Sequence, residues 1–221
     1  MGVVYLAMFS GLLQALGYLI YIRKSLRNEV NPNPTTWFMF AYGTATLTVL
    51  ELATVGWDLE GNFKIFILPI TCAILSLRVA AICCSKGQFK WPKELLSRIA
   101  ISIDLSLTVA YAIVWYASND ERISQETRDV LTLAFLILTN VSTVVSFVPM
   151  VAETWKNPEG EHPLPWSVWC TAYCLLGCVT FAEHGFATVL MVYPVSNAIL
   201  HGLMGFLAWR TPPGKASLAR P

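Results

Sequence analysis

The segment Pro69-Ile70-Thr71-Cys72-Ala73-Ile74-Leu75 recurs later in the chain as Pro194-Val195-Ser196-Asn197-Ala198-Ile199-Leu200. Four of the seven positions are identical and two exchange Ile for Val or Thr for Ser, at a separation of 125 residues. Two further matches follow the same order along the chain: 31–34 with 162–165 at separation 131, and 52–57 with 181–186 at separation 129. One match between apolar helices can arise by chance, but three in order indicate an internal duplication.

The composition around these segments is that of a membrane protein. Of the 221 residues, 55% are hydrophobic and 13% are charged, and the mean hydropathy is +0.55. A soluble domain carries about 25% charged residues. Runs of about 20 apolar residues, long enough to cross a bilayer, occur at 3–22, 35–57, 63–84, 97–118, 130–152, 165–184 and 185–209. The first run lacks a basic leader and a small-residue cleavage site, so we expect a retained helix.

The duplication and the seven runs together predict an all-α membrane protein of two parallel three-helix repeats joined by a linker helix. Three spans reverse the chain's direction, and one further span restores it, so the two repeats share one orientation. The predicted units are a first repeat (1–84), a loop and linker region (85–127), a second repeat (128–210) and a cytoplasmic tail (211–221).

Basic residues predict how the chain sits in the bilayer. Eleven of the 15 Lys and Arg residues fall on the side that holds the C-terminus, and three fall on the other side. Because basic loops stay in the cytoplasm, the N-terminus is expected outside and the C-terminus inside, in a plasma or inner membrane rather than an organelle. The net charge of +1 gives no field that attracts nucleic acid.

The 3+1+3 plan, the outer N-terminus and the Pro-containing turns at 31–34 and 162–165 resemble the SWEET/PQ-loop transporter superfamily over nearly the whole chain. The Pro-Gln dipeptide of PQ-loop proteins is absent from both of these turns. In SWEET transporters the places of Cys72 and Asn197 face a central cavity, so the resemblance implies that both line a substrate site. It also implies that Trp57 and Phe186 flank the substrate. Contact between helices for Asn197 and anchoring at the membrane surface for the two aromatic residues are the alternatives.

Five prolines are candidate hinges or gates. Pro34 and Pro165 stand at helix starts, where proline costs little, and the resemblance implies a hinge there. Pro69 and Pro194 lie within spans, where proline weakens the helical ladder. Pro149 lies near the cytoplasmic end of its span and is a candidate gate.

Four ionisable residues inside the spans are candidates for proton coupling: Glu51, Glu183, Asp104 and His201. Glu183 is adjacent to His184 and can pair with it. Asp104 can instead pair with Arg78 or Arg98 as a structural contact, His201 can satisfy a helix contact, and both glutamates can lie in water at the membrane surface.

The sequence favours a transporter of a small polar solute, a sugar by resemblance, that works by alternating access. A proton-coupled amino acid or vitamin carrier is one alternative, and a non-transporting receptor or a subunit of a larger membrane complex is another. The chain shows no catalytic signature, cofactor motif or Cys/His metal spacing, so neither an enzyme nor a cofactor is expected. The expected partners are a small-molecule substrate and the lipid bilayer, with a homo-oligomer or a larger complex left open.

Overall fold

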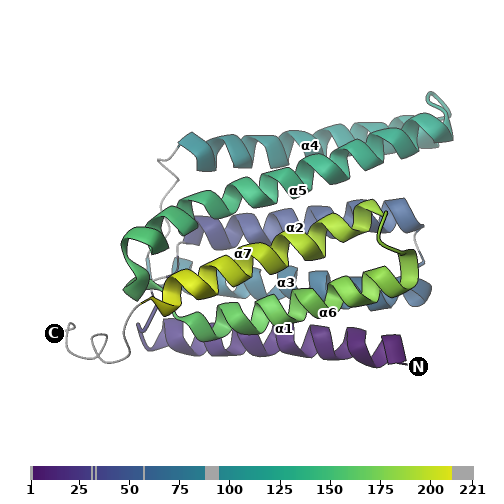
Figure 1. The fold of residues 1–221 in the computed structure, drawn as a ribbon. Helices are drawn as coiled ribbons and strands as arrows, with labels where there is room; N and C mark the ends of the chain where they lie inside the picture. Colours follow the sequence, from purple (N-terminus) through teal and green to yellow (C-terminus); the bar gives the residue numbers. More distant parts are fainter. Residues whose placement is uncertain (1, 31, 33, 57, 88–94, 211–221) are drawn as a thin grey trace.

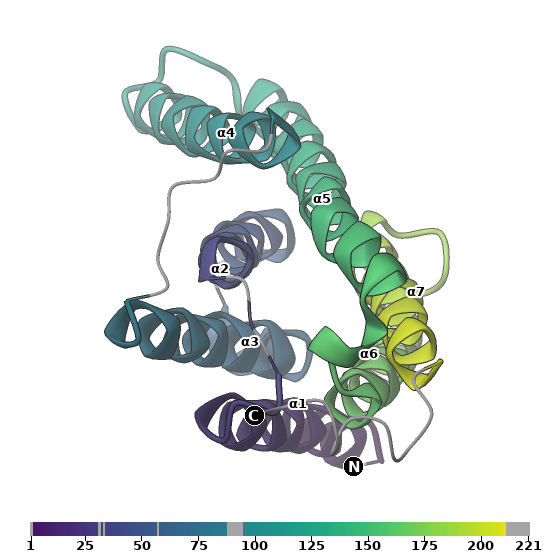
Figure 2. The ribbon, with the colours of Figure 1, turned by 90° about the vertical axis from the view of Figure 1, so that its left-hand side faces the viewer.

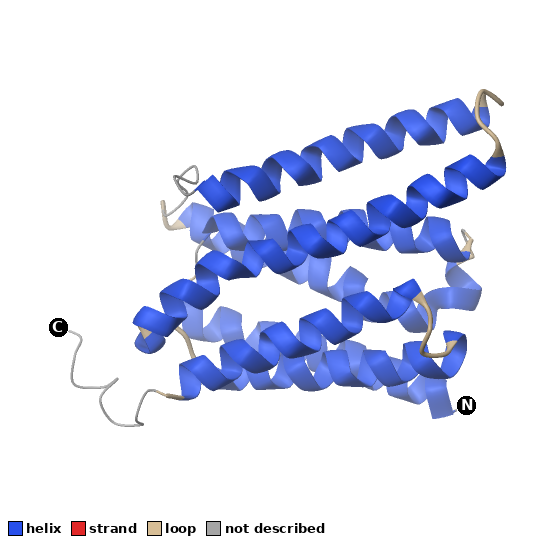
Figure 3. Cartoon of the chain, turned by 45° about the horizontal axis from the view of Figure 1, so that its top comes forward, coloured by secondary structure: helices blue, strands red, loops and turns tan. Residues whose placement is uncertain are grey.

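A computed structural model describes residues 2–30, 32, 34–56, 58–87 and 95–210; Trp57 and the predicted tail lie outside this range. The described residues form helices and loops without a strand (Figure 3). The helices are α1 (Gly2–Leu26), α2 (Pro34–Val55), α3 (Leu59–Ser85), α4 (Leu95–Asn119), α5 (Gln125–Lys156), α6 (Pro163–His184) and α7 (Val192–Trp209). Short 3-10 turns at Pro158–Gly160 (η1) and Val189–Met191 (η2) precede α6 and α7.

All seven helices are long and apolar enough to cross a membrane, which confirms the predicted all-α class and the number of spans. The helix ends differ from the sequence expectation where polar residues extend a helix beyond its apolar run. Ser124 caps α5 by accepting a hydrogen bond from the Thr127 amide, so α5 begins before its apolar stretch. α6 ends at Gly185, whose positive φ of 77° stops the helix, and a loop separates it from α7.

The helices pack as two groups of three. α3 contacts both α1 and α2, and α7 contacts both α5 and α6. α1 packs on α6 and α2 packs on α5, so the two groups meet along two helix pairs. Figure 2 shows α1, α3 and α2 along one side and α6, α7 and α5 along the other. α4 packs mainly on α5, with a smaller contact to α2. α1 begins and α7 ends at opposite ends of the bundle (Figure 1).

The buried faces of α1 and α5 match residue for residue. The buried residues of α1 are Ala7, Ser10, Gly11, Gln14, Gly17, Tyr18, Tyr21 and Ser25. Adding 129 to these numbers gives a buried residue of α5 in seven cases: Leu136, Thr139, Asn140, Ser146, Phe147, Met150 and Thr154. Equal burial along a whole helix face means that both helices have the same rotation about their axes.

The other two helix pairs match in the same way. All eight buried residues of α6 fall 129 positions after a buried residue of α2. Seven of the eight buried residues of α7 fall 125 positions after a buried residue of α3, including Asn197 after Cys72. Separation 129 also pairs Pro34 with Pro163, the first residues of two 22-residue helices. The expected pairing of Pro34 with Pro165 at separation 131 is therefore shifted by two residues.

Candidate functional site

A thiol and five hydroxyls meet in the centre of the molecule. The Cys72 Sγ atom of α3 lies 3.2 Å from the Tyr18 hydroxyl of α1, 3.7 Å from Thr44 Oγ1 of α2 and 3.6 Å from the Tyr173 hydroxyl of α6. We call this group, with Ser76 and Tyr193, the Cys72 cluster. Ser76 Oγ is in hydrogen-bond contact with Tyr18, and the hydroxyls of Tyr173 and Tyr193 are 3.1 Å apart.

The Cys72 cluster joins helices from both groups of three. α1, α2 and α3 supply Tyr18, Thr44, Cys72 and Ser76, while α6 and α7 supply the two other tyrosines. All six side chains are buried. Hydroxyls both donate and accept hydrogen bonds, and none of the six groups is an ordinary charge carrier at neutral pH. The arrangement is therefore suited to a neutral polar solute.

Two predicted residues on α7 lie directly beside this cluster. The Asn197 side chain donates to the Tyr193 carbonyl at 3.0 Å, and His201 Nδ1 lies 2.8 Å from the Asn197 carbonyl. Because a carbonyl only accepts, Nδ1 is the nitrogen that carries a proton in this contact. The His201 ring packs against Tyr173, with centroids 4.8 Å apart. Among the described contacts, Asn197 and Cys72 do not bond to each other but meet through the Tyr173–Tyr193 pair.

Glu51 is the acidic residue next to the Cys72 cluster. Its side chain is buried in α2, on one helical face with Thr44 and Thr48. Its partner at separation 129 is Thr180, which is also buried. The carboxyl lies seven residues, about two helical turns, along α2 from Thr44 of the Cys72 cluster.

Aromatic rings close one side of the cluster, at the end of the bundle where α2 and α6 begin. We call them the aromatic plug; they are Tyr18, Tyr21, Trp37, Phe40, Phe147, Trp166 and Trp169. Trp37 and Trp166 stack across the two groups with centroids 6.3 Å apart at 28°. Adding 129 converts the contact Tyr18–Trp37 into Phe147–Trp166 and Trp37–Phe40 into Trp166–Trp169. The plug is therefore built from corresponding residues of the two groups.

Glu161, in the loop before α6, forms hydrogen bonds with two residues of the aromatic plug. Its carboxylate accepts hydrogen bonds of 3.0 Å from the Tyr21 hydroxyl and from Trp166 Nε1, so it links α1 to α6. Burial raises the pKa of Glu161 to about 7; the Trp166 and Tyr21 hydrogen bonds oppose the shift, and the nearby charge of Glu153 adds to it.

An ion pair joins the two groups at the opposite end of the bundle. Lys64 Nζ of α3 lies 2.9 Å from both carboxylate oxygens of Glu183 in α6. Glu183 therefore pairs with Lys64 rather than with the adjacent His184. The Cys72 cluster lies between this ion pair and the aromatic plug, so the two groups touch at both ends.

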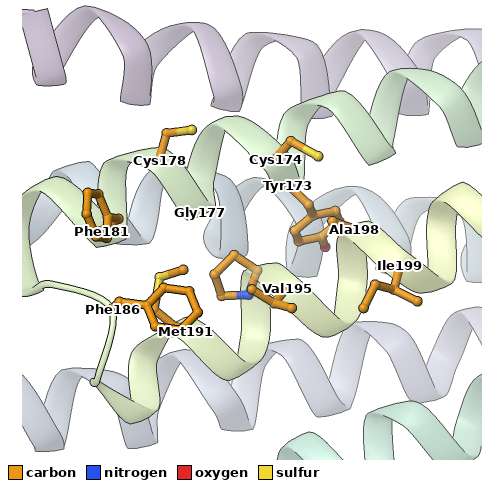
Figure 4. Close-up of a pocket in the computed structure, with 11 residues that line it drawn as sticks. Tyr173, Cys174, Gly177, Cys178, Phe181, Phe186, Met191, Val195, Ala198 and Ile199 are labelled. Carbon is orange, nitrogen blue, oxygen red and sulfur yellow. The ribbon is translucent and has the colours of Figure 1, made fainter.

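Phe186 lies away from the cluster. Its side chain is 74% exposed and lines an apolar groove of about 440 Å³ between α6 and α7, beside Phe181 and Met191. Figure 4 shows Phe181, Phe186 and Met191 toward one end of the groove and Val195 and Tyr173 farther along it. An apolar groove between spanning helices faces lipid, so this position suits contact with the bilayer.

The five prolines fall into different local settings. Pro69 lies inside α3 and Pro149 inside α5, whereas Pro34 starts α2 and Pro165 stands in the first turn of α6. Pro194 is the third residue of α7 rather than an interior residue. It follows the 3-10 turn Val189–Met191 and lies within the predicted span, but nearer to a helix start than Pro69 does, and its role as a hinge stays a prediction.

Sequence reasoning did not single out Tyr18, Thr44, Ser76, Tyr173, Tyr193 or Glu161. The hydroxyl residues lie in apolar runs, and whether their side chains face one another depends on how each helix is rotated about its axis. One signal was present: Trp37 and Trp166 are separated by 129, the same distance as the match of 52–57 with 181–186.

Comparison of the chain with protein-family models, curated proteins and solved structures found no match.

Proposed function

We propose that this integral membrane protein is a transporter that moves a small, neutral, polar solute by alternating access between two three-helix units. The observation that carries the proposal is the Cys72 cluster, a buried set of hydroxyls supplied by both groups of helices and enclosed at both ends. Such a site offers several weak donors and acceptors, which suits the hydroxyls of a sugar or a similar solute.

The matching burial of α1 with α5, α2 with α6 and α3 with α7 supports two copies of one three-helix unit. Two similar units around a site at mid-depth are the architecture on which rocking motions act. The aromatic plug and the Lys64–Glu183 pair are contacts between the units on opposite sides of the site. On this proposal the structure is an occluded state, and transport requires each end to open in turn.

A proton-coupled carrier of amino acids or vitamins is the second candidate. The observation in its favour is the buried Glu51 carboxyl, about two turns along α2 from Thr44 of the cluster. Uptake driven by an imposed proton gradient, and lost in Glu51→Gln, separates this candidate from a uniporter. A receptor or a subunit of a larger complex is the remaining candidate, and for it binding occurs without flux.

The test is uptake into proteoliposomes across a panel of radiolabelled sugars, amino acids and vitamins, with protein-free liposomes as the background. For a substrate that is taken up, Tyr173→Phe is expected to raise KM because it removes a hydroxyl from the cluster. Tyr111→Phe is the matched control, since Tyr111 lies in α4 outside the cluster and packs against Phe135. Specific ligand binding without any flux would favour a receptor instead.

A further inference from the structure

A second buried polar site lies where α4 meets α5 and α2. Asp104 of α4 is 5% exposed, and its carboxyl points to the other two helices rather than to the lipid-facing side of α4. The salt bridges among the described residues do not include it, so the expected pairing with Arg78 or Arg98 is not formed. A buried carboxylate without a cation is costly.

Two polar atoms at this site are neighbours and both lack a hydrogen-bond partner. Ser142 of α5 lies next to the Asp104 carboxyl, close enough for an interaction. Even so, Asp104 Oδ1 and Ser142 Oγ are both fully buried and make no hydrogen bond of acceptable geometry, with each other or with any other described group. The Asp104 carboxyl and the Ser142 hydroxyl are therefore neighbours rather than a hydrogen-bonded pair. Paired orphan oxygens of this kind point to a ligand between them.

Other oxygens converge on the same place. A Cβ atom at Gly43 of α2 would lie 3.8 Å from Asp104 Oδ2 and 3.8 Å from Thr143 Oγ1, so both oxygens face the same glycine of α2. Thr139 Oγ1, one turn before Thr143 on α5, is also buried without a partner. Thr143 already donates its proton to the Thr139 carbonyl at 3.0 Å, which leaves the lone pairs of its oxygen as acceptors.

We propose that Asp104, Ser142 and Thr143 form a binding site for a small monovalent cation such as Na⁺. Carboxylate and hydroxyl oxygens are hard ligands that suit hard cations. The site has one carboxylate and otherwise neutral donors, so a single positive charge neutralises it, whereas a divalent ion would leave an uncompensated charge in a low-dielectric interior.

The site is separate from the Cys72 cluster, and the inference does not rest on the proposed transport. A bound cation would fasten α4 and α5 to α2, one of the two helix pairs along which the three-helix groups meet. Water between the same atoms, or a proton on Asp104, would satisfy them without any dependence on sodium. The experiment therefore compares cations at constant ionic strength.

The test is the thermal unfolding of the purified protein in NaCl, KCl and choline chloride. A ligand that binds only the folded state stabilises it by mass action, and we expect Tm in saturating NaCl to exceed Tm in choline chloride by roughly 2–5 °C. Asp104→Asn is expected to abolish this shift. Ser142→Ala and Thr143→Val are each expected to weaken the apparent Na⁺ affinity by about tenfold, because each removes one ligand oxygen.

Thr171→Val is the matched control. It removes a helical hydroxyl that bonds to its own helix, at the Ser167 carbonyl of α6, and should keep the full sodium shift. Equal Tm values for the wild type in NaCl and choline chloride would overturn the proposal, as would an undiminished shift in Asp104→Asn. If Asp104→Asn does not fold, an unchanged Na⁺ affinity in both Ser142→Ala and Thr143→Val overturns it as well. None of these outcomes depends on a transport assay.

Discussion

Glu161 is the residue whose ionisation should couple pH to the stability of the aromatic plug. Burial raises its pKa from 4.5 to about 7, so the folded state holds a proton that the unfolded state has released. Stability from this group is therefore fully present below about pH 4.5 and is lost as pH rises to about 7. We expect the Tm of the wild type to fall across this window relative to Glu161→Gln, which stays neutral.

The measurement is the difference in Tm between wild type and Glu161→Gln at a series of pH values, since other titrations cancel between the two proteins. Glu153→Gln is a second control. The charge of Glu153 contributes to the raised pKa, so its removal should move the window to lower pH. A Tm difference that is flat between pH 4.5 and 7 would contradict the prediction.

Gly17 of α1 is required by the closeness of Trp169 in α6. A Cβ at this position would overlap the indole ring, with its Cδ1 atom only 2.6 Å away. The ring is buried and donates from Nε1 to the Gln14 carbonyl at 3.2 Å, so it has little freedom to move. We expect Gly17→Ala to destabilise the protein by about 1–3 kcal/mol, as overpacking does.

Gly177→Ala in α6 is the matched change, because its Cβ would meet the Pro194 Cβ at an ordinary 3.8 Å. Both substitutions gain the same helix propensity of about 1 kcal/mol, so the difference in their Tm values isolates the overlap. The prediction is wrong if the two variants unfold at the same temperature.

Of the residues at the candidate site, the sequence predicted Cys72 and Asn197 as counterparts but did not predict which residues they contact. The match of Pro69–Leu75 with Pro194–Leu200 placed Cys72 and Asn197 as counterparts, and the burial of α3 and α7 agrees with that register. The partners of Cys72 come from three other helices, whose rotations no local pattern determines. Glu161 had no signal at all, because an acid in a loop becomes significant only when Tyr21 and Trp166 close over it.

At the scale of elements, hydrophobic length predicted all seven helices, because a spanning helix must be apolar over about 20 residues. Helix ends were less predictable, since polar turns such as Gln125–Asp129 extend α5 without adding hydrophobicity. The position of the helix start also explains why Pro69 and Pro194, which the sequence match pairs, lie in different settings. Pro69 falls in the interior of α3, while α7 begins only at Val192 and leaves Pro194 in its first turn.

Pro69 should therefore weaken α3 where Pro194 does not weaken α7. Pro69 has no N–H to donate to the Ile65 carbonyl, four residues earlier. In Pro69→Ala this hydrogen bond forms, and we expect hydrogen exchange of the following amides in α3 to slow by roughly tenfold, equivalent to about 1.4 kcal/mol. Pro194→Ala adds no bond and should leave exchange in α7 unchanged. Similar changes in both helices would refute the distinction.

At the scale of the whole molecule, the two groups of helices are joined at one end by stacked rings and at the other by charge. The two contacts differ in how solvent acts on them: burial of rings is insensitive to salt, whereas a partly exposed ion pair is screened. The end that holds Lys64 and Glu183 is therefore the one that ionic strength should loosen, and the end that holds Trp37 and Trp166 should stay closed.

Reversal of the Lys64–Glu183 pair tests this directly. Lys64→Glu or Glu183→Lys alone places like charges together and should open this end, at a cost of about 1 kcal/mol or roughly fivefold in population. Cys72 lies eight residues, about 12 Å, along α3 from Lys64, so its modification by a water-soluble thiol reagent should accelerate by a similar factor. The double reversal should restore the wild-type rate, because it recreates the ion pair.

Cys83, buried at the aromatic end, is the internal control and should stay unreactive in every variant. Peptide mass spectrometry reads both thiols separately, and equal Cys72 rates in all four proteins would mean that the ion pair does not hold the two groups together.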